Sequence, residues 1–239
     1  MFNGKNKAIT FSYDDAVTQD IRLIEILNKY NLKATFNINS KLLGTELYLM
    51  LGDKKVSAIK NKPQDIKYIY QGHEVAAHTL THPHLPEIEE DKEIIRQVEE
   101  DRLNLTDIVG YEVMGMAYPG GPPNCNDHVA EIIKNNTNIK YARSFCVDES
   151  FDVDKDMYQF QGTISHWENW DSFFEFGEKF LNLQTDKPQL LYIWGHSFEL
   201  DVEPRRWERF EEFCKLISGK DNIFYGTNIE VFETLWKKV

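Results

Sequence analysis

Four of the seven histidines of this chain lie in one stretch, which reads GHEVAAHTLTHPHL from Gly72 to Leu85. Its His73-Glu74 pair suggests the HExxH motif of zinc peptidases, in which two histidines stand four residues apart on a helix. The next histidine here is His78, and at a spacing of five residues the two rings would diverge by about 140° around a helix axis. The intervening EVAA is instead typical of a buried strand. We therefore reject the peptidase motif and predict that His73 is structural.

A different histidine pair has the spacing of a chelating site. His78 and His82 stand at i and i+4, which on a helical turn would put both imidazoles on one face, where they can bind one cation. Further polar residues follow predicted apolar strands: Asp14 and Asp15 in one place, and His196 in another. Each feature alone is commonplace, because paired aspartates often only form a turn. The prediction rests on the set of two carboxylates and three histidines.

The elements that would position these side chains alternate along the chain. Apolar and aromatic runs predict strands, and apolar residues at helical spacing predict helices. The predicted strands are Ala8–Tyr13, Ala34–Ile38, Glu74–His78, Glu112–Ala117, Tyr141–Phe145, Phe160–Ile164, Leu190–Trp194 and Ile223–Tyr225. The predicted helices are Gln19–Tyr30, Lys41–Lys60, Glu87–Val109, Asn126–Asn135, a segment through Leu181, Arg206–Ile217 and Ile229–Lys237.

This order predicts one domain over residues 1–239 with an α/β fold, either a (β/α) barrel or a barrel-like variant. No repeat, composition shift or Pro/Gly/Ser-rich linker interrupts it. In a parallel barrel the carboxyl ends of the strands meet on one face. Asp14, Asp15, His78, His82 and His196 are therefore expected to converge, although they are far apart in the sequence.

The composition excludes several classes of protein. With a net charge of −12, neither a nucleic-acid partner nor an anionic membrane surface is expected. Cys125, Cys146 and Cys214 lack CxxC spacing, which favours reduced thiols over a disulfide framework or a cysteine zinc site. No apolar run reaches the ~20 residues of a membrane span. The first residues, MFNGKNKAITFSYDD, lack the apolar core of a secretory signal. We expect a cytoplasmic protein, and a secreted form with a trimmed leader stays open.

Ordered motifs over nearly the whole chain resemble those of a known family. TFSYDDA at Thr10–Ala16 matches a TFDDG-like motif, and HTLTH at His78–His82 matches H-[ST]-x-x-H. AYPGG at Ala117–Gly121 matches a strand that ends in a Pro-Gly turn, and LLYIWGH at Leu190–His196 matches a strand that ends in histidine. Together they resemble the polysaccharide deacetylases of carbohydrate esterase family 4, which have the NodB-homology fold. The resemblance implies an irregular (β/α) barrel, often of seven strands.

The resemblance also implies roles for individual residues. Asp14 matches the general base and His196 the general acid, while the backbone N–H near Tyr118 matches part of an oxyanion site. One divalent metal ion would be bound by three ligands, Asp15, His78 and His82. Two imidazoles and a carboxylate suit Zn²⁺ best, with Co²⁺, Ni²⁺ and Fe²⁺ as further possibilities.

These implied roles are chemically consistent. A bound metal ion lowers the pKa of a water molecule and polarises the acetyl carbonyl. Asp14 would take a proton as the water attacks, and a protonated His196 would give one to the leaving amine or alkoxide. Glu199, close to His196 in the sequence, could orient an imidazole, as carboxylates around metal sites often do. It could equally be a surface charge on a loop.

The sequence departs from the family pattern at several positions. Many relatives carry an arginine in the third motif that orients the catalytic aspartate, and AYPGG has none. We hypothesise that Arg143, in YARSF on the next strand, pairs with Asp14; an ordinary surface ion pair is the alternative. Ala16 replaces the usual glycine of the first motif. The fourth motif is not legible, and SHWENW at 165–170 occupies its region.

Several residues near these motifs are candidates for contact with a sugar. His166, Trp167, Trp194 and Pro119 are the tentative substrate-binding residues, because an exposed aromatic ring binds the apolar face of a sugar well. Trp170 is predicted to lie in the core instead.

We therefore predict a metal-dependent hydrolase that removes N- or O-linked acetyl groups from an acetylated oligo- or polysaccharide. Two alternatives stay open. One is hydrolysis of a non-sugar amide or imide C–N bond on the same fold, and the other is a catalytically silent carbohydrate-binding relative. The intact base, ligand and acid positions count against a silent relative, whereas the missing arginine of the third motif counts for it.

Overall fold

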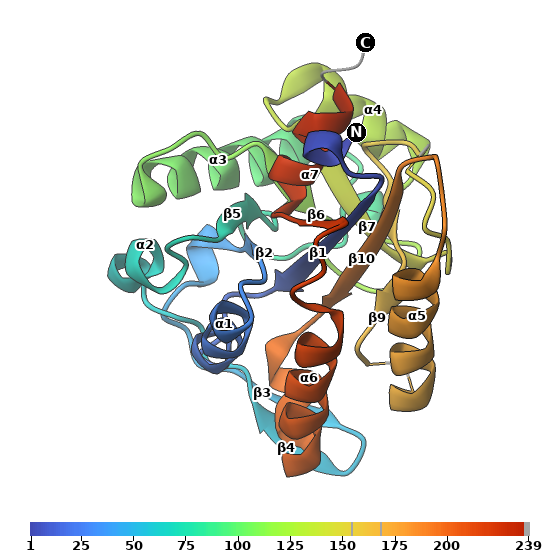
Figure 1. The fold of residues 1–239 in the computed structure, drawn as a ribbon. Helices are drawn as coiled ribbons and strands as arrows, with labels where there is room; N and C mark the ends of the chain where they lie inside the picture. The colour runs from blue at the N-terminus through green and yellow to red at the C-terminus, as the bar shows by residue number, and fades with distance from the viewer. Residues whose placement is uncertain (154, 168, 237–239) are drawn as a thin grey trace.

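The centre of the molecule is a parallel sheet that curls into a nearly closed barrel, with helices packed around it (Figure 1). The computed structural model describes residues 1–153, 155–167 and 169–236, apart from the side chain of Cys146. The strands are β1 (Lys7–Asp14), β2 (Ala34–Ile38), β3 (Tyr48–Leu51), β4 (Lys54–Ser57), β5 (Glu74–Ala77), β6 (Gly115–Ala117), β7 (Tyr141–Val147), β8 (Phe160–Gly162), β9 (Ile164–Ser165), β10 (Gln189–Gly195) and β11 (Ile223–Tyr225). The barrel order is β8-β7-β6-β5-β2-β1-β10-β9, and β11 also pairs with β1.

Two short strands bring the edges of the sheet together. The sequence predicted one strand at Phe160–Ile164, but the chain turns at Thr163, so that β8 and β9 pair at opposite edges of the sheet. Thr163 donates its N–H to the carbonyl of Tyr192 in β10 at 2.8 Å. The expected (β/α) barrel is confirmed, and this division gives its main order eight strands where seven were expected.

Alternation along β1 separates an apolar outer face from a polar interior. Ile9 and Phe11 belong to the hydrophobic cluster that the barrel forms with the helices. Ser12, on the opposite face, accepts a hydrogen bond from Asn37 Nδ2 at 2.9 Å inside the barrel. Because side chains alternate with a period of two, Asp14 at the end of β1 points to the same interior.

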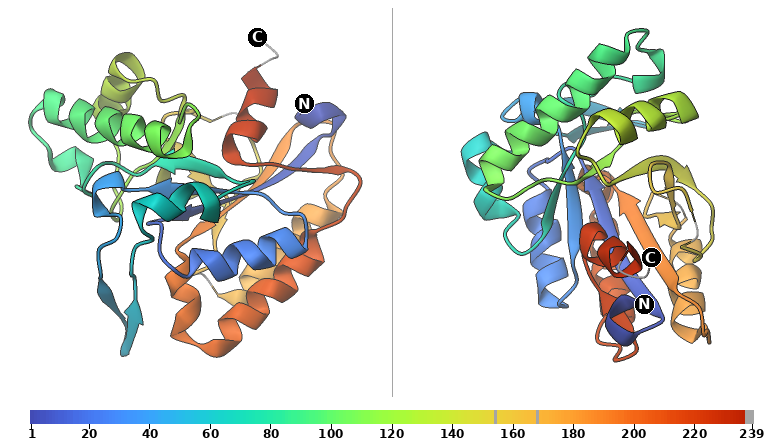
Figure 2. Two further views of the ribbon diagram at one scale, coloured as in Figure 1. Left: turned by 90° about the vertical axis from the view of Figure 1, so that its left-hand side faces the viewer. Right: turned by 90° about the horizontal axis from the view of Figure 1, so that it is seen from above.

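Helices cover the outside of the barrel in two groups. Their bounds are α1 (Asp20–Lys29), α2 (Ile66–Ile69), α3 (Asp91–Val109), α4 (Asp127–Asn136), α5 (Trp170–Asn182), α6 (Pro204–Ile217) and α7 (Asn228–Trp236). α3 packs with α4 on one side, and α1, α5 and α6 pack on the other (Figure 2). The apolar spacing buries one face of α1 through Leu23, Ile24 and Leu27. Across the described residues, no helix combines the length and the apolar character that a membrane crossing needs.

A β-hairpin stands where the sequence predicted a helix at Lys41–Lys60. β3 and β4 pair antiparallel and project from the barrel (Figures 1 and 2). Gly52 and Asp53 form the turn, and Gly52 has a φ of 65°, which glycine adopts without strain. A Gly-Asp pair between two short runs is a hairpin signal, and here it overrides the helical spacing. The inner face of the hairpin packs against Val17 and Phe198.

The other predicted elements are present with shifted ends. β6 begins at Gly115 rather than Glu112. α3 begins at Asp91 rather than Glu87, because a 3-10 turn at Leu85–Glu87 precedes it. The last helix was predicted to run to Lys237, which lies outside the described residues.

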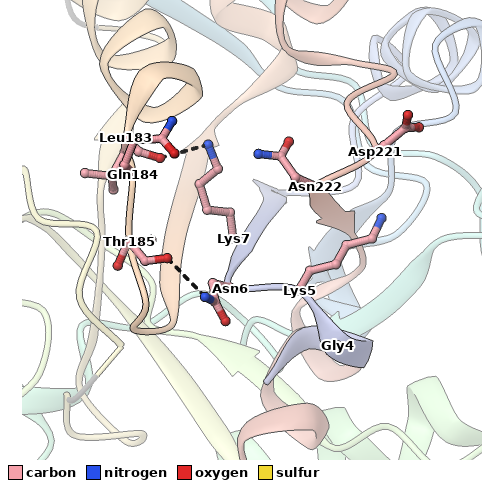
Figure 3. A pocket seen from close by; sticks show the side chains of 9 residues that line it. All are labelled: Gly4, Lys5, Asn6, Lys7, Leu183, Gln184, Thr185, Asp221 and Asn222. Atoms are coloured by element: carbon pink, nitrogen blue, oxygen red, sulfur yellow. Dashed lines mark hydrogen bonds between the residues drawn. The ribbon is translucent and has the colours of Figure 1, made fainter.

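The amino ends of the strands are closed by structural contacts. The 3-10 helix at Phe2–Gly4 packs against α7 at this end. A cavity of about 370 Å³ lies beside the starts of β1 and β11 (Figure 3). There Lys7 Nζ donates to the carbonyls of Phe180, Leu181 and Leu183, at distances of 3.1, 2.9 and 3.2 Å. A cation at a helix C-terminus is stabilising, so Lys7 acts as a cap for α5.

Candidate active site

A larger cavity, of about 660 Å³, opens at the carboxyl ends of β1, β5, β6 and β10. The structure brings six residues from distant parts of the sequence onto its wall: Asp14, Asp15, His78, His82, Arg143 and His196. The hairpin adds an apolar side through Leu47 and Leu49. The parallel barrel thus produces the convergence that the positions at strand ends implied.

Asp15, His78 and His82 form the group that can hold a metal ion. Their ligand atoms all lie within 4.8 Å of one another. The two imidazole rings stand edge to face, with centroids 5.0 Å apart. A small divalent cation needs nitrogen and oxygen ligands that close on a single point, and this group offers three.

The two histidines do not share a helical turn, which corrects the geometry inferred from their spacing. Residues 78–84 form an irregular loop after β5. Within it Thr79 and His82 have φ values of 66° and 60°, in the left-handed region. That conformation costs a non-glycine residue roughly 1–2 kcal/mol, and such strain concentrates at functional sites. The loop backbone, rather than helical periodicity, brings His82 back toward His78.

Neighbouring elements hold this loop in place. Asn39, just after β2, donates its side-chain amide to the carbonyl of His78 and to the next carbonyl along the chain. Asp101, buried in α3, accepts a hydrogen bond from the N–H of His78 at 3.0 Å. Gln97, one turn earlier in α3, exchanges hydrogen bonds with Thr81. The loop is therefore fixed from two sides.

His78 has the hydrogen-bonding pattern of a metal ligand. Its Nδ1 lies 2.8 Å from the carbonyl oxygen of Ala117, to which it can only donate. Its Nε2 is buried and has no partner among the described residues. Burial lowers the pKa of His78 to about 4, against the opposing effect of the neighbouring carboxylates. The ring is therefore neutral, with a buried lone pair that only a ligand can satisfy, and this set of residues fits a divalent cation.

Asp15, the third residue of this group, has a partner that the sequence did not reveal. Lys60 Nζ lies 2.6 Å from Asp15 Oδ1, and both side chains are largely buried. Burial raises the pKa of Asp15, but the charge of Lys60, followed by the nearby histidines, outweighs it and holds that pKa well below its usual range. Nothing in the local pattern distinguished Lys60 from the surface lysines around it.

Both carboxylate oxygens of Asp14 are held in place. Arg143 Nη2 donates to Oδ2 at 2.5 Å, and Asn37 Nδ2 donates to Oδ1 at 2.8 Å. The pairing hypothesised for Arg143 is present, and it is a buried pair rather than a surface one. Burial raises the pKa of Asp14, but Arg143 outweighs it and keeps Asp14 ionised at neutral pH. Asn37 was missed, although a polar residue inside the apolar strand ATFNI was a signal for it.

His196 follows β10 and faces the two aspartates. Its Nε2 lies 3.8 Å from Asp14 Oδ2 and 4.0 Å from Asp15 Oδ2. Its Nδ1 donates to Glu199 Oε1 at 3.0 Å. Burial would lower the pKa of His196, but the charge and hydrogen bond of Glu199 outweigh it and raise that pKa to about 9. His196 is therefore a cation at neutral pH, and Glu199 orients it rather than being a loop surface charge.

The arrangement of these residues matches a known family. A family model described as polysaccharide deacetylase matches residues 3–141, which is more than half of the chain. The chain belongs to the polysaccharide deacetylase family. The resemblance seen in the motifs is thereby confirmed, and membership indicates a hydrolase that removes acetyl groups from carbohydrate. No curated protein matches the sequence.

Solved structures of polysaccharide deacetylases show the same fold. A putative polysaccharide deacetylase from Mycobacterium smegmatis is similar with a TM-score of 0.68 and 16% identity, over 98% of this chain and 92% of that one. A probable polysaccharide deacetylase from Pseudomonas aeruginosa PAO1 has the same TM-score of 0.68 at 12% identity, over 98% of this chain and 92% of that one. A family 4 carbohydrate esterase from Streptomyces lividans, in complex with acetate, is similar with a TM-score of 0.57 and 12% identity, over 93% of this chain and 92% of that one.

The third motif of this polysaccharide deacetylase does not supply its expected donor. The backbone N–H of Tyr118 already donates to the carbonyl of Arg143 at 2.9 Å, because the pairing of β6 with β7 continues one residue past β6. The prediction that this N–H serves the oxyanion is therefore wrong. Pro119, expected near the substrate, is buried and does not line the cavity. Gly120 and Gly121 line it instead.

His166 lies beneath the site rather than facing a substrate. It is fully buried, its Nε2 donates to Glu199 Oε2 at 2.7 Å, and its Nδ1 lies 3.0 Å from the hydroxyl of Tyr13. A side chain at Gly195 would collide with this ring. The prediction that His166 lines the pocket is therefore wrong, because the missing side chain of Gly195 lets the backbone cover it. His166 instead helps to fix Glu199.

Two tryptophans border a second cavity of about 280 Å³, which adjoins the first at His196. Trp167 is 43% exposed. Trp194 is buried, and the guanidinium of Arg143 lies 4.6 Å from the centroid of its ring. Trp170 packs against the core, as predicted.

The other two histidines of the 72–85 stretch bind protein groups. His73 Nδ1 accepts the N–H of Ala34 at 3.1 Å, and its Nε2 lies 3.1 Å from Asn28 Oδ1. His73 is therefore structural, as predicted. His84 Nε2 lies 3.3 Å from the carbonyl of Gly121 and connects two loops of the site.

Proposed function

We propose that this chain is a metal-dependent deacetylase that hydrolyses N- or O-linked acetyl groups of an acetylated oligo- or polysaccharide. The observation that carries the proposal is the three-ligand group of Asp15, His78 and His82, with Asp14 and His196 on the wall of the same cavity. A divalent ion, most suitably Zn²⁺, fits two imidazoles and a carboxylate. When bound, such an ion lowers the pKa of a water molecule and polarises the acetyl carbonyl.

Asp14 is the proposed general base. It is ionised at neutral pH because Arg143 holds its pKa below the usual range, and it lines the cavity. Arg143 and Asn37 fix its two oxygens, so the carboxylate is oriented before the substrate binds. Proton transfer by a positioned side chain of this kind typically contributes about 10²–10⁴ in rate.

His196 is the proposed general acid. Its protonated ring directs Nε2 toward the two aspartates while Nδ1 stays bonded to Glu199. The proton on Nε2 can therefore pass to the leaving nitrogen or oxygen as the bond to the acetyl carbon breaks. An amide requires this proton more strongly than an ester, because an amide anion is the poorer leaving group.

We further propose that the N–H groups of Gly120 and Gly121 stabilise the oxyanion. Both residues line the cavity, and neither N–H donates to another backbone group among the described residues. Gly120 has a φ of 84°, a left-handed conformation that glycine adopts without strain. Free N–H groups beside a cavity are the donors that such an intermediate needs.

Acetate release tests the proposal. Wild type with Zn²⁺ is expected to release acetate from acetylated chito-oligosaccharides, which carry N-acetyl groups, or from acetylated xylo-oligosaccharides, which carry O-acetyl groups. Asp14→Asn should lower either activity by about 10²–10⁴. His196→Gln should lower hydrolysis of an N-acetyl substrate more than that of an O-acetyl one. Hydrolysis of a ureide or imide without acetate release from either sugar would favour the non-sugar alternative and contradict the proposal.

A further inference from the structure

Lys60 is a buried cation that the proposed mechanism does not use. It is 5% exposed and lies where the hairpin returns to the barrel. Its Nζ makes one hydrogen bond to a described residue, that to Asp15 Oδ1 at 2.6 Å. Lysine is almost never fully buried unless it is paired, so the burial of Lys60 depends on Asp15.

The backbone around Lys60 is held independently of its side chain. The N–H of Lys60 donates to the carbonyl of Thr45 at 2.9 Å. On either side, Thr18 N–H donates to Ile59 O and Asn61 N–H donates to Ala16 O, each at 2.8 Å. The first bond joins the two ends of the hairpin segment, and the other two connect it to the loop after β1. The ammonium group is therefore free to serve the site rather than the fold.

The hydrogen bond from Lys60 to Asp15 leaves one carboxylate oxygen of Asp15 available to a metal ion. Oδ1 accepts from Lys60, whereas Oδ2 faces His196, 4.0 Å from its Nε2. The same contact also cancels a charge. Asp14 is paired with Arg143 and Asp15 with Lys60, so neither carboxylate leaves its negative charge uncompensated around the ligands.

We infer that Lys60 is a positioning residue that makes Asp15 a one-oxygen ligand and weakens the affinity of the site for a divalent cation. The inference rests on the proposed function. A metal ion bound by two imidazoles and by a carboxylate that is already paired with a lysine has less of its positive charge neutralised by its ligands. More of that charge then acts on the groups that react. Even at the dielectric constant of water, repulsion between a single and a double charge a few ångströms apart changes affinity about tenfold or more.

Three substitutions separate the charge of Lys60 from its hydrogen bond. Lys60→Gln keeps a donor but removes the charge, Lys60→Met removes both, and Lys60→Arg keeps both. Lys55→Met is the matched control, because it removes one positive charge from an exposed position on the same hairpin. The readouts are the dissociation constant for Zn²⁺, from competition with a chromophoric chelator, and the visible absorption of the Co²⁺-loaded proteins.

Lys60→Gln and Lys60→Met should bind Zn²⁺ at least about tenfold more tightly than wild type, and Lys60→Arg and Lys55→Met should match wild type. The Co²⁺ bands should weaken only in Lys60→Met, because a second oxygen of Asp15 then joins and raises the coordination number. Unchanged or weaker Zn²⁺ binding by Lys60→Gln would overturn the inference. This result would be decisive even if Lys60→Met did not fold.

The failure of this inference and that of the proposed function give different results. If wild type bound no Zn²⁺, the proposed metal site would be wrong and the role of Lys60 with it. If wild type bound one Zn²⁺, His78→Ala bound none and Lys60→Gln bound as wild type does, the metal site would stand. Only the role of Lys60 would then be wrong.

Discussion

Three buried carboxylates at one end of the barrel interior and one at the other end have pKa values shifted in opposite directions. At the carboxyl end, Asp14, Asp15 and Glu199 each have a cationic partner, and their pKa values lie below the usual range. At the amino end, Glu74 accepts hydrogen bonds from the hydroxyl of Thr35 at 2.7 Å, the hydroxyl of Tyr141 at 2.8 Å and a backbone N–H. None of these partners is a cation, and burial raises the pKa of Glu74 to about 7.

The difference teaches that partners, rather than burial, decide which buried acids of this molecule are charged. Desolvation raises the pKa of every one of these groups. Neutral donors around Glu74 reduce the shift without reversing it. A guanidinium or an ammonium beside Asp14 or Asp15 reverses it. Of the four acids compared, the three that are ionised, Asp14, Asp15 and Glu199, therefore lie at the end of the barrel where chemistry is proposed.

Removal of the Arg143 guanidinium from its buried pair with Asp14 should have the largest effect on stability. Arg143→Met leaves Asp14 buried without its partner, and breaking a buried pair in this way costs about 3–5 kcal/mol. Because the pKa of Asp14 is lowered in the folded state, the pair stabilises above the unfolded pKa, and this stability is lost as the pH falls through the folded pKa. The loss in Arg143→Met, measured by urea unfolding, should therefore be largest at neutral pH and shrink below about pH 4.

Arg209→Met is the control for this measurement, because Arg209 pairs with the exposed Asp171. It should unfold as wild type does. Equal destabilisation by the two substitutions would show that the buried pair is no different from a surface one, and the comparison between the two ends would fail.

Substitution of Glu74, the buried acid at the amino end of the barrel, should change how the free energy of unfolding depends on pH. The pKa of Glu74 is raised from an ordinary 4.5 to about 7, so its contribution is full below pH 4.5 and is lost as the pH rises through 7. Glu74→Gln should flatten this fall in the free energy of unfolding by up to about 3 kcal/mol. Glu112→Gln, at an exposed position, should leave the profile unchanged. A Glu74→Gln profile parallel to that of wild type would mean that Glu74 is ionised.

Removal of the orienting carboxylate should have a smaller effect, on catalysis rather than on folding. Glu199 raises the pKa of His196 to about 9, so Glu199→Gln should move the alkaline limb of the kcat profile to lower pH. The rate at neutral pH should fall by roughly 10–100-fold, as is typical when a partner of a site residue is removed. An alkaline limb that stays where it is in wild type would show that Glu199 does not act through His196.

The barrel and the convergence at its end could be predicted because both depend on local patterns. Apolar runs placed most strands, and Asp14, Asp15 and His196 all follow such runs. A parallel barrel then brings strand ends together whatever their separation in the sequence. The pairing of Asp14 with Arg143, which are 129 positions apart, was accessible only because the third motif lacks its arginine.

The remaining features depend on backbone conformation and on long-range contacts. The loop between His78 and His82 uses left-handed residues, which sequence spacing does not show. The ladder bond that occupies the N–H of Tyr118 depends on where β6 stops pairing. Lys60 reaches Asp15 only because the Gly52 turn makes a hairpin where helical spacing had suggested a helix.

The central claim is that only two of the four histidines at 72–85 bind a metal ion, and the Zn²⁺ content of matched variants tests it most directly. After loading and dialysis, wild type and His84→Ala should each retain one Zn²⁺ per chain and release acetate. His78→Ala should retain none and be inactive. Asp14→Asn should retain the ion but lose hydrolysis. If His78→Ala kept both its Zn²⁺ and its activity, the assignment of the site would be contradicted.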